Sequence, residues 1–199
     1  MRILYLKIMA LSLFLFGIIG CGGSKPSRYY LLTPQPEITQ LQTDLKNIKI
    51  GLGPVQFPEY LKRPQIISYI GTNQLNLADY EHWAEPLDGN FSRVMAENLT
   101  ELIPTDQVYI YPFIGNISLD YRIIIEVRQF ETNVQSAVRL VAQWQILQEE
   151  DKESLIIKRS EYMQNVDAEN YKSIVAGMDK VTADLSREIA QFFNTRKAK

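Results

Sequence analysis

Hydrophobic and polar residues alternate most regularly in the second half of the chain. A period of two is typical of strands that bury one face and leave the other in water. The inward positions are predicted to be Tyr121, Ile123, Ile125 and Val127 in one strand, and Val134, Val138, Leu140, Ala142, Trp144 and Ile146 in the next. Turns at 131–133 and 149–153, followed by a third strand at 155–159, complete an antiparallel meander.

Shorter strand patterns fill the first half. We expect strands at 28–32 and 48–57, and a hairpin of 65–70 with 75–77 around Gly71-Thr72-Asn73. Residues 33–47 contain prolines and many polar residues, which predicts a loop. Alternation is lost around 78–87, which places Trp83 just before a helix.

Two stretches have the three- and four-residue spacing of helices. The first begins near Glu85, with Pro86 in its first turn and Pro104 at its end. The second begins near Ala168, with Asp167 as its cap. The predicted buried faces are Leu87, Phe91, Val94, Leu99 and Leu102, and then Ile174, Met178, Val181, Leu185, Ile189 and Phe192. The pattern predicts a single α+β domain, in which two helices pack on a largely antiparallel or mixed sheet, with a layered α/β arrangement as the alternative.

The N-terminus has the pattern of a cleaved signal peptide. Arg2 and Lys7 precede an apolar run at 8–19, which is shorter than the about 20 residues that span a bilayer. Ile18-Ile19-Gly20-Cys21 then resembles a bacterial lipobox. We therefore predict that residues 1–20 are removed and that Cys21 carries acyl chains. A buried core helix and an incidental cysteine are the alternatives; the run lacks the polar face of a core helix.

A short tether is predicted between the lipid and the domain. Residues 22–27 are Gly-Gly-Ser-Lys-Pro-Ser, and six residues reach on the order of 20 Å. The divisions are thus 1–20 for the signal peptide, 21–27 for the lipidated cysteine and tether, and 28–195 for the domain. Gly22 is not acidic, and by resemblance to lipoproteins of Gram-negative envelopes this favours the inner leaflet of the outer membrane, facing the periplasm.

Composition narrows the function further. With 199 residues, 46% of them hydrophobic, and a formal net charge of −2, the chain can bury a core but has no basic footprint for nucleic acid. One cysteine precludes an internal disulfide. His82 is the single histidine, and the acids around it (Asp79, Glu81, Glu85) have no recognised metal-ligand spacing. We predict no enzyme activity, metal or cofactor.

Two segments have aromatic and charged residues without an obvious core role. They are 57–67, framed by prolines, and 78–87, which contains Trp83. Such residues suit protein interfaces, and folding back onto the core is the equal alternative.

With Arg28-Tyr29-Tyr30-Leu31-Leu32 and Gly51-Leu52-Gly53-Pro54-Val55, these two segments resemble the ABC-type transport auxiliary lipoproteins, among them the paraquat-inducible protein C (PqiC) lipoproteins. The resemblance covers about residues 21–193. The residues that match the family motifs are Tyr60, Leu61, Arg63, Pro64, Trp83, Glu85 and Pro86, and the resemblance assigns them to a fold-defining or partner-contact surface.

The resemblance implies a non-enzymatic role in the cell envelope. Members of this family work with MCE (mammalian cell entry) domain proteins in the periplasm and with inner-membrane transport components that move phospholipids or other hydrophobic molecules. The chain would then be an outer-membrane adaptor, lipid-anchored and homo-oligomeric. The alternatives are a periplasmic lipid carrier, which would hold phospholipid itself, and an envelope hydrolase that depends on His82.

Overall fold

The regular alternation in the second half of the chain produces the three longest strands. The computed structural model describes residues 2, 5, 25–35, 47–103 and 105–196. β6 (Tyr121–Thr132), β7 (Ala137–Gln148) and β8 (Ser154–Asn165) form the predicted antiparallel meander. Ile123 lies opposite Ile146, and Ala142 lies opposite Ser160, so the buried positions of neighbouring strands share one face.

The other edge of β6 is shared by two short strands. β2 (Ile50–Gln56) pairs in parallel with the first half of β6, and β3 (Gln65–Tyr69) pairs in parallel near its end, where Ser68 lies opposite Thr132. Between them the chain leaves the sheet and forms the 3-10 helix η1 (Glu59–Leu61). The proline-framed segment therefore leaves the sheet between two strands, β2 and β3, that both pair with β6.

Three further strands complete a mixed sheet, which has eight strands among the described residues. β4 (Leu75–Trp83) is antiparallel to β3, β1 (Arg28–Tyr30) is parallel to β4, and β5 (Val108–Ile110) is parallel to β2. The α+β prediction is confirmed, with a mixed rather than largely antiparallel sheet. The expected loss of strand structure after residue 77 was wrong, because β4 continues to Trp83.

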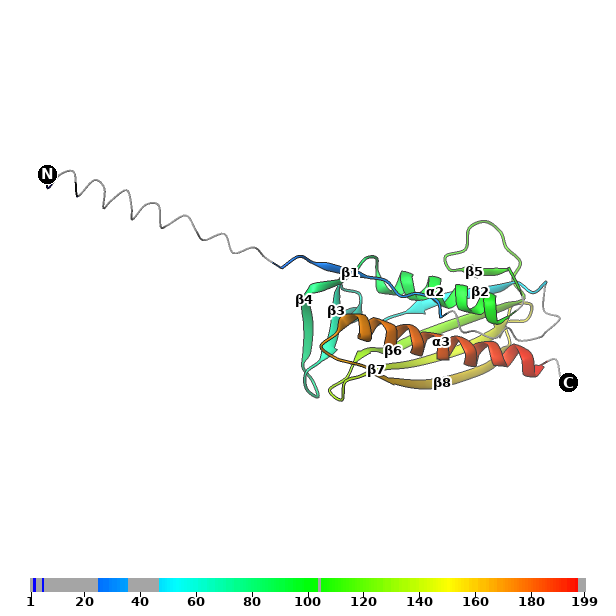
Figure 1. The fold of residues 1–199 in the computed structure, drawn as a ribbon. Coiled ribbons are helices and arrows are strands. Elements are labelled where there is room, and N and C mark those ends of the chain that lie inside the picture. Colours follow the sequence, from blue (N-terminus) through cyan, green and yellow to red (C-terminus); the bar gives the residue numbers. More distant parts are fainter. Residues whose placement is uncertain (1, 3–4, 6–24, 36–46, 104, 197–199) are drawn as a thin grey trace.

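Two helices cover one face of the sheet (Figure 1). α2 (Leu87–Leu102) packs on β2 and β5, and α3 (Tyr171–Arg196) packs on β7 and β8. Phe91 of α2 contacts Phe57 and Phe130 edge to face, with ring centroids 5.3 and 5.4 Å apart. The predicted inward positions of both helices are buried, except Phe192, which is half-buried. No helix among the described residues has the length and apolar character needed to cross a membrane.

The ends of the elements differ from the prediction in detail. Pro86 precedes α2 instead of lying in its first turn. α3 begins at Tyr171, where Asn170 Oδ1 accepts the Lys172 backbone N–H at 3.1 Å, whereas Asp167 closes the preceding turn. Val134 belongs to the β6–β7 turn and is 55% exposed.

The predicted signal peptide, apart from Arg2 and Tyr5, lies outside the described residues, as do Cys21 and Pro104. The predicted lipid anchor therefore stays a prediction.

Candidate functional site: a motif surface beside the N-terminal strand

The first described strand is fixed to the sheet by a buried carboxylate. Arg28 lies opposite Glu81 in the β1–β4 register and donates Nε–H to both of its carboxylate oxygens at 2.9 Å. Tyr30 donates its hydroxyl to the same carboxylate at 2.7 Å. Glu81 is only 5% exposed, and the Arg28 guanidinium holds the pKa of its carboxyl below the usual range. The N-terminal strand is thus held by charge as well as by backbone pairing.

The next residues cross both helices and bond to a polar side chain on each. Leu32 donates its backbone N–H to Asn90 Oδ1 of α2 at 2.6 Å. Thr33 donates its backbone N–H and its hydroxyl to Asp179 of α3, each at 2.9 Å. Asp179 is 6% exposed, and burial raises its pKa to about 6. We call Arg28–Thr33 the N-terminal strap.

The two motif segments, distant in sequence, meet beside this strap. The Trp83 backbone N–H donates to the Pro64 carbonyl oxygen at 2.6 Å. The next amide, that of Ala84, donates to the Tyr30 carbonyl oxygen at 2.9 Å. The structure therefore brings both motif segments and the N-terminal strap to one place, at the end of the molecule where the β3–β4 hairpin lies (Figure 1).

Several motif residues point into the protein. Leu61 and Trp83 are 3% and 5% exposed and belong to the hydrophobic core. Tyr60 is half-buried and donates its hydroxyl to Glu131 Oε2 of β6 at 3.0 Å. Glu131 is 2% exposed, and burial raises its pKa above the usual range. These residues hold the η1 excursion against the sheet.

Other motif residues point outward. We call the exposed set Lys62, Arg63, Pro64, Ala84 and Pro86 the motif surface. Lys62 is paired with Glu59, but Arg63 has no ion pair or side-chain hydrogen bond within the described part of the chain. Glu85 is half-buried and paired with Arg93. Arg63 therefore presents an uncommitted guanidinium next to the exposed Pro64.

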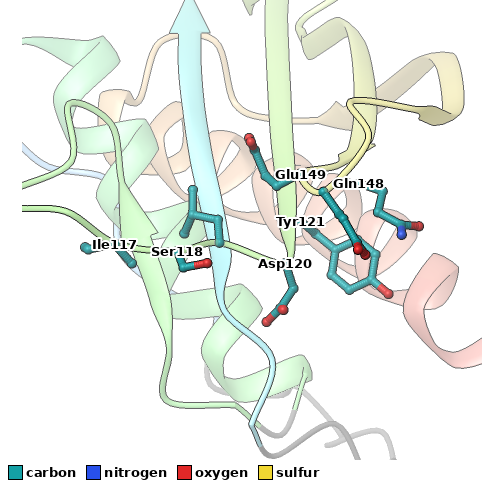
Figure 2. Close-up of a pocket in the computed structure, with 8 residues that line it drawn as sticks. Ile117, Ser118, Asp120, Tyr121, Gln148 and Glu149 are labelled. Carbon is teal, nitrogen blue, oxygen red and sulfur yellow. The ribbon is translucent and has the colours of Figure 1, made fainter.

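A polar cavity lies where β6 begins and β7 ends (Figure 2). Its volume is ≈ 480 Å³, and Asp120, Tyr121, Gln148 and Glu149 line it. Asp120 Oδ2 accepts the Lys49 backbone N–H at 2.7 Å, and Glu149 is paired with Arg122 and Lys152. Asp120 and Glu149 are thus engaged within the chain, and a polar lining is unsuited to an acyl chain.

The acids around His82 do not form a metal site. Consecutive residues of β4 point to opposite faces of the sheet. Glu81 points inward to Arg28, whereas the His82 ring contacts the Tyr29 ring in a tilted arrangement, with ring centroids 5.8 Å apart. Across the described residues, no group of three His, Cys, Asp or Glu side chains is placed to hold a metal ion.

Sequence reasoning missed the buried polar groups that build this region. Glu81, Asn90, Glu131 and Asp179 each occupy an inward position where a hydrophobic residue is the usual expectation. The pattern gave no signal for their burial. Asp179 lies one residue, about 100° around the helix, from Met178 on the predicted stripe, and Glu131 lies in a predicted turn.

Comparison with known proteins gives a family and several solved structures with a similar fold. The family model described as ABC-type transport auxiliary lipoprotein component matches residues 29–190. A crystal structure of an uncharacterized protein is similar with a TM-score of 0.70 and 18% identity over 85% of this chain and 99% of that one. Protein XCC0632 from Xanthomonas campestris, of the DUF330 family, gives a TM-score of 0.66 and 15% identity over 83% and 94%. None of the curated proteins matches the sequence.

Proposed function

The chain belongs to the ABC-type transport auxiliary lipoprotein family, and from this membership we propose that it is a non-catalytic adaptor of an MCE-type lipid transport system. In this role it docks a periplasmic MCE-domain protein, and through it the inner-membrane transport components, at the outer membrane. The transported molecule is a phospholipid or a similar hydrophobic molecule. The observation that carries the proposal is the family match over most of the domain, together with the convergence of both motif segments on one surface.

The motif surface is the part of the protein that we assign to partner contact. Arg63 is exposed and has no partner within the described chain, and Pro64 and Pro86 are rigid and exposed. A guanidinium flanked by preorganised backbone loses little conformational entropy when it binds, which favours a contact role. Tyr60, Leu61 and Trp83 instead support this surface from within, so the motif residues divide between the two roles.

Anchorage complements this assignment. We propose that Cys21 is acylated and that residues 22–27 link it to the N-terminal strap, which begins at Arg28. A tether of six residues, with a reach on the order of 20 Å, would keep the domain close to the inner leaflet of the outer membrane. Because the strap adjoins the motif surface, an MCE partner bound there would be held near that membrane.

The test is capture of the partner by the full lipidated chain. We expect the chain, extracted in mild detergent, to co-purify with an MCE-domain protein encoded in the same genome. The Arg63→Ala variant should lose at least about tenfold of this capture, which is typical of a contact residue at the centre of an interface. Its thermal unfolding temperature should stay unchanged, because Arg63 has no partner to lose. Arg128→Ala, on the exposed face of β6, is the matched control and should retain capture.

Two results would contradict the proposal. Normal lipidation without any MCE association would remove the adaptor role. Phospholipid bound one-to-one by the unlipidated chain in native mass spectrometry, without MCE capture, would favour the lipid carrier instead.

A further inference from the structure

The longest unpaired strand edge in the sheet is that of β8. β8 pairs with β7 on one side, and within the described part of the chain no strand pairs with its other side. Figure 1 shows β8 at the margin of the sheet, with α3 over its inner face. An open edge of 12 residues presents a row of backbone donors and acceptors that can pair with another strand.

The register of β7 with β8 decides which residues face this open edge. Val138 lies opposite Gln164, and the Val166 backbone N–H donates to the Ser136 carbonyl oxygen at 2.9 Å. Even-numbered residues of β8 therefore direct their backbone groups toward β7. The odd-numbered residues, from Ile157 to Asn165, direct theirs outward, and their side chains lie together on the exposed face of the sheet.

The side chains of these odd-numbered residues are self-complementary. In chain order they are Ile157, Arg159, Glu161 and Met163: apolar, positive, negative and apolar. Ile157 and Met163 are 62% and 55% exposed, which is unusual for two large hydrophobic residues on one strand. An antiparallel copy of β8 centred on Ser160 places Ile157 opposite Met163 of the copy, and Arg159 opposite Glu161.

This register is distinguished from its neighbours by charge. The two β8 strands could also pair in a neighbouring register. For the outward-facing backbone groups to stay hydrogen-bonded, the residue at the centre of the pairing must then be Arg159 or Glu161 instead of Ser160. One such register places Arg159 opposite itself, and the other places Glu161 opposite itself. Like charges directly opposite one another destabilise a strand pair, whereas opposite charges stabilise it. Only the register centred on Ser160 pairs both opposite charges and both exposed hydrophobic residues.

We propose that β8 is a homodimer interface, in which two copies pair edge to edge about a twofold axis at Ser160. The proposal adds an interface to the proposed adaptor and specifies the homo-oligomer that the family resemblance implies; it rests on that expectation alone. α3 packs on both β7 and β8. With strands about 5 Å apart, a helix centred over these two strands would lie two strand spacings, about 10 Å, from its symmetry mate. Neighbouring helices pack at about 8–10 Å, so the two α3 helices would fit side by side on the continuous sheet that the two copies form.

Charge exchange tests the interface in the detergent-extracted full chain. Native mass spectrometry and sedimentation should show a dimer for the unmodified chain. Arg159→Glu and Glu161→Arg each place like charges opposite one another at two symmetry-related contacts, and each should raise the dimer dissociation constant by at least about tenfold. The Arg159→Glu/Glu161→Arg double variant restores opposite charges in the same register, and its dissociation constant should return to within about threefold of the unmodified value.

A second charge pair on the same face of the sheet gives the control. Arg159 and Glu161 form an ion pair within β8. Arg128 and Glu126 form a similar pair within β6, but β6 is not at the edge of the sheet. Arg128→Glu should leave the dimer unchanged. Because Glu161 also pairs with Arg139 at 2.7 Å, circular dichroism on each monomer must show a retained fold.

If the unmodified chain is a monomer at all concentrations, the proposal is overturned. The charges on β8 would then serve to prevent this edge from pairing with a strand of another chain. An oligomer whose mass is insensitive to both single variants would overturn it as well. MCE capture is measured separately, so either result leaves the transport role intact.

Discussion

Asp179 is a buried carboxyl that fixes the N-terminal strap and makes the stability of the protein depend on pH. The carboxylate receives two hydrogen bonds from Thr33 and is almost fully enclosed. Its pKa of about 6 in the folded chain lies above the ordinary value of 3.8. Desolvation thus outweighs the two hydrogen bonds, so ionisation of Asp179 opposes folding.

The Asp179→Asn variant should therefore be more stable at neutral pH. Between about pH 4 and pH 6 the folded chain binds more protons at Asp179 than the unfolded chain does, so its contribution to the free energy of unfolding falls as pH rises and stays low above pH 6. The carboxamide accepts the Thr33 amide hydrogen bond without ionising. We expect a gain of about 1–3 kcal/mol at pH 8 and little change at pH 4, measured by urea unfolding across this range. Stability curves that run parallel for both proteins would contradict this account.

Tyr60 shows why the motif roles could not be separated from the sequence. Its ring and hydroxyl suit an interface, yet it donates to a buried Glu131 that the pattern assigned to a turn. Arg63, three residues later, is exposed. The motif was recognisable in the sequence, but its division into inward and outward residues depends on the η1 excursion between β2 and β3. That excursion is a tertiary feature, because it arises where β2 and β3 both pair with the distant strand β6.

Among the elements, the long strands and helices and the short strands β1, β2 and β3 were predictable, whereas β5 and the end of β4 were not. β6, β7, β8 and α3 repeat their pattern over many residues, so burial of one face dominates their choice of structure. β5 has three residues and is a strand because β2 lies beside it. The end of β4 escaped prediction because Glu81 occupies an inward position, where it is compensated by Arg28 and Tyr30 from a distant part of the chain.

The packing of α3 on the sheet depends on one residue without a side chain. A Cβ on Gly177 would lie 2.5 Å from Val166 Cγ1 and 3.2 Å from Val138 Cγ2. We expect Gly177→Ala to displace α3 from β7 and to lower the free energy of unfolding by about 1–3 kcal/mol, despite the better helix propensity of alanine.

Gly89 provides the matched control, because it is an exposed helical glycine in α2 with no atom within 4 Å of an added Cβ. Gly89→Ala should raise the free energy of unfolding by about 0.5–1 kcal/mol. Chemical denaturation of both variants under the same conditions measures the difference. Equal effects of the two substitutions would show that close packing at Gly177 does not limit stability.

For the protein in its envelope setting, the prediction that matters most concerns Cys21. The Cys21→Ser variant cannot form the thioether to a glycerolipid, so intact mass spectrometry should show loss of the acyl mass and retention of residues 1–20. The membrane-bound full chain should show the opposite on both counts. Ser24→Ala in the tether is the control and should be processed normally. Masses of Cys21→Ser and of the unmodified chain that differ only by the exchange of sulfur for oxygen would exclude lipidation at this position.

The N-terminal strap has a mechanical consequence. β1 lies in the sheet beside β4 and pairs with it in parallel, so its hydrogen bonds are evenly spaced and run across to β4 at a slant. A pull along β1 from the tether would load these bonds and the Arg28–Glu81 pair together, in shear, instead of opening them one after another. Leu32 and Thr33 would transfer the remaining load to both helices. If Cys21 is lipidated and the motif surface is bound as proposed, tension between the lipid anchor and the partner would thus be carried by the domain as a whole.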